Sequence, residues 1–411
     1  MSKTPFFIRI VRPTYGKWLL IRHRVRTADY GKIPHEGPFL ILSNHAHVYD
    51  PFLISSSLPI HVRWVAGAYL FKNKLVSLLL GRWIGGIAKQ QGRSDLQTIR
   101  DISASFKQGE VVGLFPEGTR TWDGEPYGFD VSTAKLVRLF NVPVVLLNLE
   151  GAYALKPRWA RFARKGYMTI RVVRTLMPDE MKAMKISEIM QVLEDTLGFS
   201  HTKWEAEHRI PYISPRKAVG LEKLLYLCPS CGGRSTIHAK GDRVFCDACD
   251  LHFKLDPYDD LVLVSGNPNG IASIPAWHAW ERAQLGTINA THTAECPLFP
   301  PDKGVLFQHG VDNRLLTLSK RFSLTLEPTR LVVKFPKAVS SGILQGLESI
   351  LFDFSRMQSM IINAKGTVEF FHDDELWRIR IVGDRSIVKY VELFTDWKKL
   401  HGNEDSEEER A

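Results

Sequence analysis

The sequence predicts an α/β protein, in which a sheet flanked by helices is followed by a small cysteine-rich module and a β-rich C-terminal domain. Short apolar runs alternate with helical patterns from about residue 37 to residue 200, which is typical of an α/β sheet. Four cysteines then fall in two closely spaced pairs, and from about residue 305 consecutive β-patterns are separated by turn residues. With 411 residues the chain is too long for one ordinary core, so we expect several domains.

The first region contains four apolar runs that read as strands, and several of them are apolar enough to be buried on both faces. They are 38–44, 110–115, 142–150 and 167–173, with helices predicted over 94–109 and 131–141. Ser94 is a good N-cap for the first of these helices, and Gly109 is a good end for it. We expect the α/β domain to cover residues 31–205 and to be followed by a polar linker at 206–226.

Basic residues are concentrated in two stretches of a chain whose net charge is +10. Seven Lys and Arg and no acid precede Asp29, beside Phe6 and Trp18, and seven more lie within 156–174, again without an acid. Such stretches suit membrane lipid, phosphorylated substrates or nucleic acid, although a solvated basic face has the same composition. We interpret residues 1–30 as an amphipathic leader that associates with a membrane; a helix packed on a neighbouring domain would share the pattern.

The composition indicates a folded soluble protein, with 44% hydrophobic and 24% charged residues. No apolar run reaches the ~20 residues that a membrane-spanning helix needs. Basic residues interrupt the apolar residues of the N-terminus, so we expect no signal peptide. Cysteines in C-x-x-C pairs favour a metal over disulfides and a reducing compartment. We therefore expect a cytoplasmic protein that is peripheral on the inner face of the cell membrane.

Cys228, Cys231, Cys246 and Cys249 form two C-x-x-C pairs separated by fourteen residues. Four thiolates from two such knuckles suit tetrahedral zinc with no open position. We therefore predict a zinc ribbon over residues 227–256, in which the metal is structural. Basic residues between the pairs are also compatible with a nucleic-acid contact, but a small fold held together by the metal is the favoured interpretation.

After a connector at 257–304, seven β-patterns predict an accessory domain over residues 305–400. They are 305–310, 322–327, 330–335, 349–354, 359–363, 367–371 and 376–382. A final helix carries Phe394 and Trp397 along one face. Strands followed by one C-terminal helix resemble a pleckstrin-homology-like or related small barrel. The acidic tail at 401–411 is expected to be disordered.

His45 and Asp50 lie where the first strand runs into a helix, in the sequence SNHAHVYDPFL. On one continuous helix their side chains would point about 140° apart. Pro51 disfavours a helical Asp50, so we expect Asp50 to be the N-cap and His45 to lie in the turn before it. A turn can bring together an imidazole base and the carboxylate that orients it. An ordinary capping aspartate beside an incidental histidine has the same spacing.

A second stretch, GEVVGLFPEGTRT at residues 109–121, predicts a strand that ends in Pro-Glu-Gly-Thr-Arg. Gly118 permits a tight turn at this point. The planar guanidinium of Arg120 can bind a phosphate or a carboxylate through two parallel hydrogen bonds. Because the end of a strand in an α/β sheet is a common place for a ligand, the stretch predicts a binding site.

With Asn44 before His45, these two stretches resemble the glycerolipid acyltransferases typified by bacterial 1-acylglycerol-3-phosphate acyltransferase. The first motif of that family is Asn-His, four residues and Asp, and the third is Phe-Pro-Glu-Gly-Thr-Arg, which residues 115–120 match. The fourth, a strand centred on Val-Pro, is matched within 142–150. The resemblance covers about residues 30–200, and two motifs in the right order make it specific. It implies an acyltransferase-type sheet.

The resemblance implies an O-acyltransferase that works without an acyl-enzyme. His45 would take the proton of the acceptor hydroxyl, Asp50 would orient the imidazole, and the alkoxide would attack an acyl thioester on acyl-CoA or acyl carrier protein. The residues that would form the acceptor pocket are Glu117, Gly118, Thr119 and Arg120, with Arg120 on the phosphate. The expected acceptor is 1-acylglycerol-3-phosphate, which would become phosphatidic acid in phospholipid biosynthesis.

The sequence departs from this family in the second motif, which usually contains an acid–Arg pair that helps to bind the acceptor. The region reads GGIAKQQGRSD, with Gln90 and Gln91 in place of the pair. Lys89 or Arg93 would then supply the cation, and another lysolipid acceptor is the alternative. The apolar run at 68–86 would line an acyl-chain tunnel or pack on the sheet.

A different class of function is a zinc-ribbon nucleic-acid-binding protein, or a scaffold, with a degenerate first domain. The intact first and third motifs argue against degeneracy. We therefore expect the partners to be a lysophospholipid acceptor, acyl-CoA or acyl carrier protein, and an anionic membrane surface, and we do not expect nucleic acid to be a partner.

Overall fold

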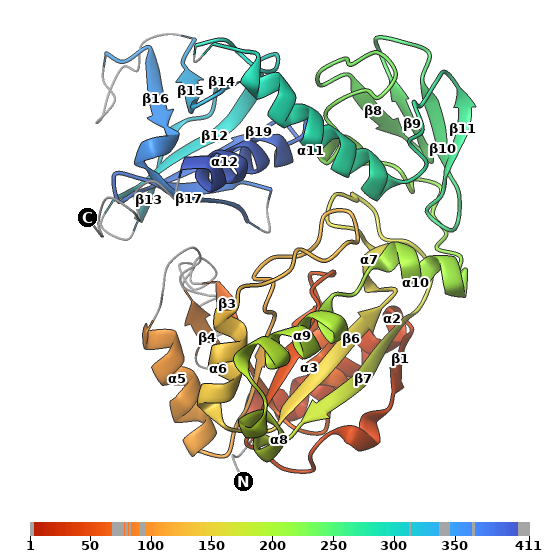
Figure 1. The fold of residues 1–411 in the computed structure, drawn as a ribbon, viewed down its shortest axis with the longest axis vertical. Coiled ribbons are helices and arrows are strands. Elements are labelled where there is room, and N and C mark those ends of the chain that lie inside the picture. The colour runs from red at the N-terminus through yellow and green to blue at the C-terminus, as the bar shows by residue number, and fades with distance from the viewer. Residues whose placement is uncertain are drawn as a thin grey trace. The chain divides into compact units, whose positions relative to one another are not determined.

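The computed structural model describes residues 4–67, 78, 81, 84–89, 96–293, 295–311, 314–336, 346–363 and 366–401 (Figure 1). The chain forms two compact units. Unit 1 comprises Met1–Arg158 and Phe162–Ser214, and unit 2 comprises Trp159–Arg161 and Pro215–Ala411. Each unit is described by itself below.

Unit 1 contains a seven-stranded sheet between two groups of helices (Figure 1). Its strands are β1 Val25–Ala28, β2 Phe39–Ser43, β3 Val62–Gly67, β4 Ile87–Lys89, β5 Val111–Leu114, β6 Val144–Glu150 and β7 Met168–Leu176. Its helices are α1 Phe6–Val11, α2 Lys17–Arg22, α3 Asp50–Ser57, α5 Leu96–Lys107, α6 Ser132–Phe140, α7 Ala152–Leu155, α8 Pro178–Ala183, α9 Ile186–Leu197 and α10 His201–His208. The strand order is β1-β7-β6-β2-β5-β3-β4, and of these neighbours only β6 and β7 are antiparallel.

Strand β2 lies inside this sheet, and all of its residues are buried. Phe39 and Ile41 belong to one apolar core, and Leu40 and Leu42 belong to a second core. Burial on both faces explains why this run shows no apolar–polar alternation. The first motif follows β2 and the third motif follows its parallel neighbour β5, so the two motifs meet at the same edge of the sheet.

The α/β fold class predicted for this region is correct. The predicted strands correspond to β2, β5, β6 and β7, and the predicted helices correspond to α5 and α6. One detail differs, because Asp50 is the first residue of α3 and its carboxylate does not cap that helix. The carboxylate instead accepts hydrogen bonds from the turn before it, at Ala46 and His47. Ser94 and most of the apolar run at 68–86 lie outside the described residues.

The leader forms α1, a π-helical turn at Arg12–Gly16 and α2. This segment packs on unit 1, because Leu19 is buried and the Arg12 guanidinium donates to the carbonyl oxygens of Pro59 and Ile60 at 2.6 and 3.0 Å. The chain then enters β1, which pairs with β7. Across the part of the chain that the structure describes, every helix is too short or too polar to cross a membrane.

Unit 2 contains two antiparallel sheets. The smaller one has the order β11-β10-β9-β8 and is built from β8 Ile237–Lys240, β9 Arg243–Cys246, β10 His252–Leu255 and β11 Leu261–Ser265. The larger one has the order β16-β15-β14-β12-β19-β18-β17, with β13 paired to β12. Its strands are β12 Asp302–Val311, β13 Arg314–Ser319, β14 Phe322–Glu327, β15 Arg330–Lys334, β16 Ser349–Asp353, β17 Met357–Ile362, β18 Val368–His372 and β19 Glu375–Ile381. The helices of unit 2 are α11 Ile274–Ala290 and α12 Val388–His401.

The β-rich C-terminal region with its closing helix is present as predicted. Three features of unit 2 differ from the expectation. Strand β13 was not anticipated, and helix α11 lies within the expected connector. The expected linker is also packed, because Leu221 and Tyr226 are buried. The apolar pattern of the sequence did not predict helix α11, because two of its buried side chains, His278 and Glu281, are polar. Residues 402–411, nearly all of the predicted tail, lie outside the described residues.

Candidate active site

His45 and Asp50 form a hydrogen-bonded pair between β2 and α3. His45 Nδ1 lies 2.8 Å from Asp50 Oδ2. The same oxygen accepts the backbone N–H groups of Ala46 at 2.9 Å and His47 at 2.8 Å. The Asp50 side chain is completely buried. Three donors therefore fix the carboxylate, and the carboxylate in turn fixes the orientation of the imidazole.

The His45 ring is stacked on Phe115, with 4.1 Å between the ring centroids and 18° between the planes. Burial lowers the pKa of His45, the Asp50 carboxylate opposes that shift, and the charges of Arg120 and Arg158 lower the pKa further. The net direction is down, so the ring is neutral at pH 7. Because Nδ1 faces Asp50, Nε2 is left to accept a proton, and no described residue is hydrogen-bonded to it.

Glu117 ties the turn of the first motif to a neighbouring loop. Its Oε1 accepts the backbone N–H of His45 at 3.2 Å, and its Oε2 accepts that of Tyr127 at 3.1 Å. Burial raises the pKa of Glu117 to about 7, even though both N–H groups favour the ionised form. The carboxyl group therefore changes its charge close to neutral pH, within hydrogen-bond distance of the His45 backbone.

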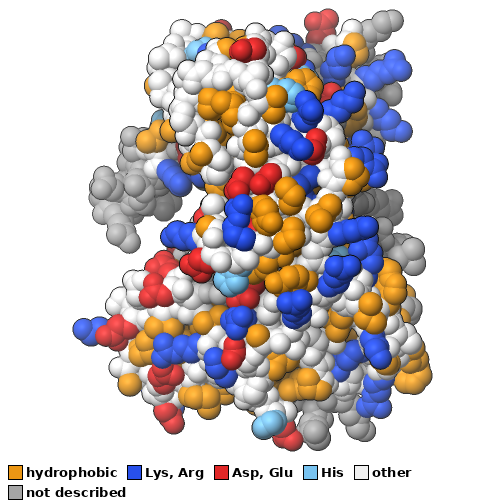
Figure 2. Space-filling view, turned by 90° about the vertical axis from the view of Figure 1, so that its right-hand side faces the viewer, with side chains coloured by type: hydrophobic (Ala, Val, Ile, Leu, Met, Phe, Trp, Pro, Cys, Tyr) orange, Lys and Arg blue, Asp and Glu red, His pale blue; other side chains and the backbone are white. Residues whose placement is uncertain are grey.

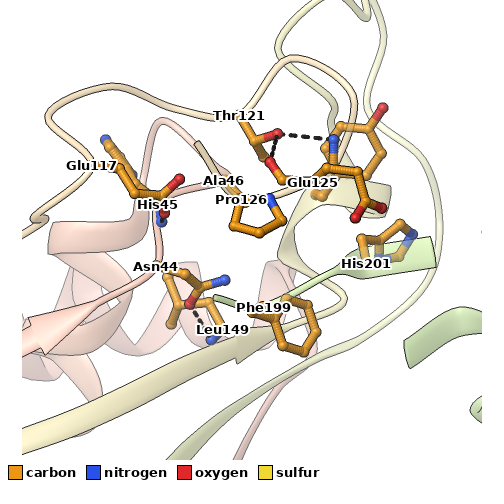
Figure 3. A pocket seen from close by; sticks show the side chains of 12 residues that line it. Asn44, His45, Ala46, Glu117, Thr121, Glu125, Pro126, Leu149, Phe199 and His201 are labelled. Atoms are coloured by element: carbon orange, nitrogen blue, oxygen red, sulfur yellow. Dashed lines mark hydrogen bonds between the residues drawn. The ribbon is translucent and has the colours of Figure 1, made fainter. Parts of the chain in front are cut away.

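His45 lines a pocket in unit 1 (Figure 3). The residues that line it are Asn44, His45, Ala46, Glu117, Thr121, Gly124, Glu125, Pro126, Leu149, Tyr153, Phe199 and His201. Figure 3 shows His45 and Glu117 on one side and Phe199 and His201 on the other. Asn44 Oδ1 accepts the N–H of Leu149 at 2.8 Å, which anchors the first motif to β6. The pocket thus combines a base, carboxyl groups and apolar walls.

The third motif forms the loop after β5. Gly118 has a φ of +68°, so the turn there requires a left-handed conformation that glycine adopts without strain. Thr119 Oγ1 accepts a hydrogen bond from Arg158 Nη1 at 2.7 Å, and the same nitrogen donates to the carbonyl oxygen of Arg120 at 2.9 Å. The next residue, Thr121, donates its N–H to the carbonyl oxygen of His45 at 3.0 Å. The loop that carries Arg120 is therefore joined to the first motif.

Of the two cations predicted for the second motif, Lys89 is the one that lies within the described residues. Lys89 is exposed at the end of β4, the last strand of the sheet. Arg93 lies outside the described residues. The structure instead places Arg158 against the third motif, which sequence reasoning did not anticipate. The signal that could have found Arg158 is the basic stretch at 156–174.

Part of that basic stretch makes contacts within the protein. Arg164 is buried and donates to the carbonyl oxygen of Ala154. Arg171, on β7, pairs with Glu150 of the neighbouring strand β6 and with Asp29, which follows the other neighbour β1. Trp159, one of the aromatic residues in the stretch, is completely buried in unit 2. The stretch therefore offers less exposed charge and aromatic surface than its sequence suggests.

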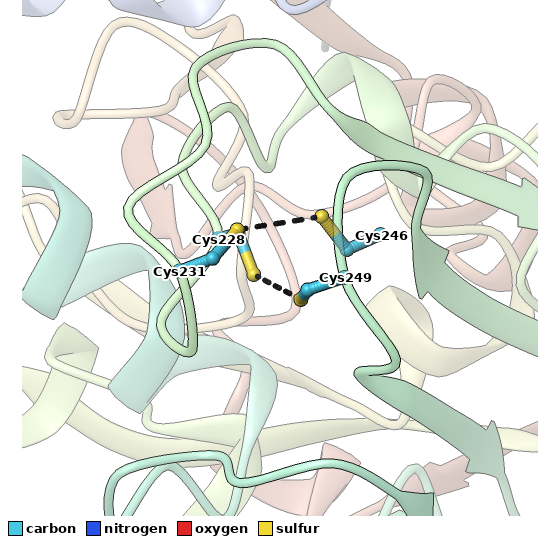
Figure 4. A group of neighbouring side chains, drawn as sticks. All are labelled: Cys228, Cys231, Cys246 and Cys249. Atoms are coloured by element: carbon cyan, nitrogen blue, oxygen red, sulfur yellow. Dashed lines mark hydrogen bonds between the residues drawn. The ribbon is translucent and has the colours of Figure 1, made fainter.

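The four cysteines of unit 2 lie together at two facing turns (Figure 4). All four sulfur atoms lie within 4.8 Å of one another. Cys228 and Cys249 are 3.6 Å apart, and Cys231 and Cys246 are 3.8 Å apart, measured between Sγ atoms. Sulfurs placed tetrahedrally at about 2.3 Å from a metal ion would be about 3.8 Å apart. The cluster therefore fits a tetrahedral metal ion and could bind one.

Both motif stretches lie in a segment that is similar to known proteins. Residues 24–149 match the sequence model of the family described as Acyltransferase. Over 191 residues the chain is 29% identical to the 1-acyl-sn-glycerol-3-phosphate acyltransferase of Bacillus subtilis (strain 168), which covers 44% of this chain and 87% of that protein. The solved structure of the 1-acyl-sn-glycerophosphate (LPA) acyltransferase PlsC from Thermotoga maritima is 21% identical, with a TM-score of 0.41, and covers 49% of this chain and 79% of that one.

Proposed function

We propose, from the acyltransferase domain at residues 24–149, that this protein moves a fatty acyl group from acyl-CoA or acyl carrier protein to the free hydroxyl of a lysophospholipid. The proposed acceptor is 1-acylglycerol-3-phosphate, the acceptor in the name of the Bacillus subtilis relative, and the product is phosphatidic acid. The observation that carries the proposal is the 2.8 Å contact between His45 Nδ1 and the buried Asp50. It leaves His45 Nε2 to act as the general base.

In the proposed reaction, His45 takes the hydroxyl proton while the acceptor oxygen attacks the carbonyl carbon of the thioester. The new C–O bond forms, the C–S bond breaks, and the imidazolium returns the proton to the departing thiolate. Asp50 stabilises the imidazolium through its charge and its hydrogen bond. Arg120 binds the phosphate of the acceptor with its planar guanidinium. Glu117 holds the backbone of His45 in place.

The acceptor is tested with purified protein, acyl-CoA or acyl carrier protein as donor, and a panel of lysolipids. Products are measured by mass spectrometry. We expect 1-acylglycerol-3-phosphate to be acylated fastest. If another lysolipid were acylated faster, the proposed acceptor would be wrong and the proposed reaction would stand. No acyl transfer to any lysolipid would overturn the proposal.

We further propose that the cysteine cluster holds one structural zinc ion. The four sulfurs are spaced as four zinc ligands would be, and four protein thiolates leave no open position for a substrate. Gly232, with a φ of +69°, turns the first knuckle, and its N–H donates to the carbonyl oxygen of Cys228 at 2.9 Å. When bound, the metal would hold the two knuckles of unit 2 together and would not take part in acyl transfer.

We propose that the protein binds the membrane through its leader. Phe6, Trp18 and Ile21 have 78%, 54% and 68% of their surface exposed. Arg9 and Lys17 are exposed in the same segment. Figure 2 shows that hydrophobic side chains are interspersed with Lys and Arg side chains on one face of the molecule. Exposed aromatic and aliphatic groups beside basic groups are what a helix needs to lie in a lipid interface.

The same surface extends to the catalytic pair. Helix α2 packs against α3, and the rings of His23 and Tyr49 are 5.7 Å apart. Val48, Tyr49 and Phe52 are 41%, 38% and 39% exposed, immediately beside Asp50. A leader that lies in the interface would therefore bring His45 close to the lipid headgroups. An acceptor could then reach the base without leaving the membrane.

A further inference from the structure

The proposed acyl transfer needs positive charge beside His45 to bind an acceptor phosphate, and Lys89, the second-motif cation that the structure describes, is exposed on β4, the last strand of the sheet. In the order β2-β5-β3-β4, the strand that carries Lys89 is three positions from β2. Neighbouring strands lie ~4.8 Å apart, which separates β4 from β2 by about 14 Å. The acid–Arg pair typical of the family is replaced by Gln90 and Gln91.

Arg158 provides a cation at the third motif. Its Nη1 donates to Thr119 Oγ1 and to the carbonyl oxygen of Arg120 at 2.7 and 2.9 Å. The guanidinium carbon lies 4.4 Å from the centre of the Trp122 ring, which is buried. Hydrogen bonds to two consecutive residues and stacking on an aromatic ring together need a planar guanidinium, and a lysine ammonium cannot reproduce both.

Through its contacts, Arg158 affects both the position of the Arg120 loop relative to His45 and the pKa of His45. The loop from Thr119 to Thr121 is held by Arg158 at its start and by the carbonyl oxygen of His45 at its end. Arg120 lies between these two attachments, so the position of its backbone relative to His45 is fixed from both sides. The charge of Arg158 also lowers the pKa of His45, together with burial and Arg120.

We infer that Arg158 is a positioning residue of the acyl-transfer site, which holds the Arg120 loop at a fixed distance from His45 so that Arg120 can reach the acceptor phosphate. The inference rests on the proposed function and adds to it a residue outside the family motifs. A misplacement of about 1 Å can cost on the order of 10²-fold in rate, so one anchoring guanidinium is sufficient to matter.

Kinetics of Arg158→Lys and Arg158→Gln test the inference, with Arg174→Gln as the matched control. Arg174 lies in the same basic stretch but pairs with Glu180. We expect both Arg158 variants to raise KM for 1-acylglycerol-3-phosphate and to lower kcat/KM on the order of 10²-fold, with KM for acyl-CoA unchanged. The acid limb of kcat/KM should move to higher pH in Arg158→Gln and stay in place in Arg158→Lys, which keeps the charge. The control should behave as the wild type.

Hydrogen–deuterium exchange of the apo protein gives a readout that needs no substrate. Amides in the segment 119–122 should exchange faster in both Arg158 variants than in the wild type and in Arg174→Gln, at similar thermal midpoints. Unchanged exchange, or an unchanged acceptor KM in both variants, would overturn the role of Arg158. If the wild type acylated no lysolipid, the proposed function would fail, and the exchange measurement would still decide whether Arg158 holds the loop.

Discussion

Opposing effects act on the imidazole of His45, the proposed general base. Burial and the charges of two arginines lower its pKa, whereas the hydrogen bond and the charge of Asp50 raise it. The net lowering keeps the ring neutral at pH 7, and the Asp50 contact leaves Nε2 as the nitrogen that can accept a proton. Orientation and protonation state thus come from the same few contacts.

Asp50→Asn should separate these effects. Asparagine keeps the size of the side chain but loses the charge that stabilises the imidazolium, so kcat should fall ~10²–10⁴-fold. Because Asp50 raises the pKa of His45, the acid limb of kcat/KM should move to lower pH in the variant. The pH profile of acyl transfer measures both kcat and the position of the acid limb. A variant with wild-type kcat and an unmoved acid limb would show that Asp50 does not act on His45.

Glu117 should make stability depend on pH. Its pKa is raised from 4.5 to about 7 in the folded protein, so the folded state favours the protonated carboxyl. The contribution of this group to stability is therefore fully present below about pH 4.5 and is lost as pH rises through about 7. Glu117→Gln has no charge to bury, so its thermal midpoint relative to the wild type should rise between pH 5 and pH 8. A difference that is the same at every pH would contradict this assignment.

At the scale of elements, the parallel pair β2 and β5 brings the two motifs together. This could be predicted, because each motif directly follows an apolar run, and parallel strands end at the same edge of a sheet. The hydrogen bonds of the Asp50 carboxylate to the turn before it could not be predicted from spacing. An aspartate that caps a helix and one that is the first residue of the helix differ by one position, and helix starts cannot be predicted that closely. The basic stretch at 156–174 includes Arg158 among seven cations, but the contact of Arg158 with the third motif could not be predicted, because Arg158 lies 38 residues beyond Arg120 in the sequence.

The cysteine knuckles are tied to a helix that sequence reasoning missed. Glu281 Oε2 accepts the N–H groups of Tyr226 and Leu227 at 2.8 and 3.1 Å, and Trp277 Nε1 donates to the carbonyl oxygen of Leu227 at 2.8 Å. These contacts hold the chain immediately before Cys228. Loss of a bound metal should therefore disturb α11 as well as the small sheet.

Cys231→Ser should lower the zinc content and the folded yield of unit 2, because the metal would lose one of four ligands. Cys296→Ser, which changes a cysteine outside the cluster, is the matched control and should keep both at wild-type values. Metal analysis of protein prepared under reducing conditions and the thermal unfolding of unit 2 provide the measurements. Wild-type protein without zinc, or a Cys231→Ser variant as stable as the control, would contradict a structural zinc site.

At the scale of the whole molecule, the order of modules could be predicted, but not which residues belong to each unit. Residues 159–161 belong to unit 2 although the chain on both sides of them belongs to unit 1. The N–H of Arg161 donates to the carbonyl oxygen of Val219, a contact across 58 residues that no local pattern reveals. The exposed apolar groups of the leader, by contrast, follow directly from its amphipathic sequence.

Phe6→Ser combined with Ile21→Ser should weaken binding to anionic liposomes, since both side chains are exposed in the leader. Substitution is a cleaner test than deletion, because Leu19 and β1 are part of unit 1. Basic groups near the membrane contribute about 1 kcal/mol each, so binding should also decrease at high salt. Leu139→Ser, at a residue 66% exposed on α6, is the control for lost apolar surface. If the protein sedimented with liposomes equally well at low and high salt, with or without the leader substitutions, the leader would not be the membrane-binding segment.

Acyl transfer by His45→Ala tests the central claim most directly. The variant is compared with the wild type and with His35→Ala, which removes an exposed histidine of the same unit. Transfer to 1-acylglycerol-3-phosphate is followed by mass spectrometry, with thermal midpoint and metal content as checks on folding. Loss of the base should reduce the rate ~10²–10⁴-fold in His45→Ala alone, without a change in either check. Full activity of a folded His45→Ala protein would contradict the role of His45 as the general base.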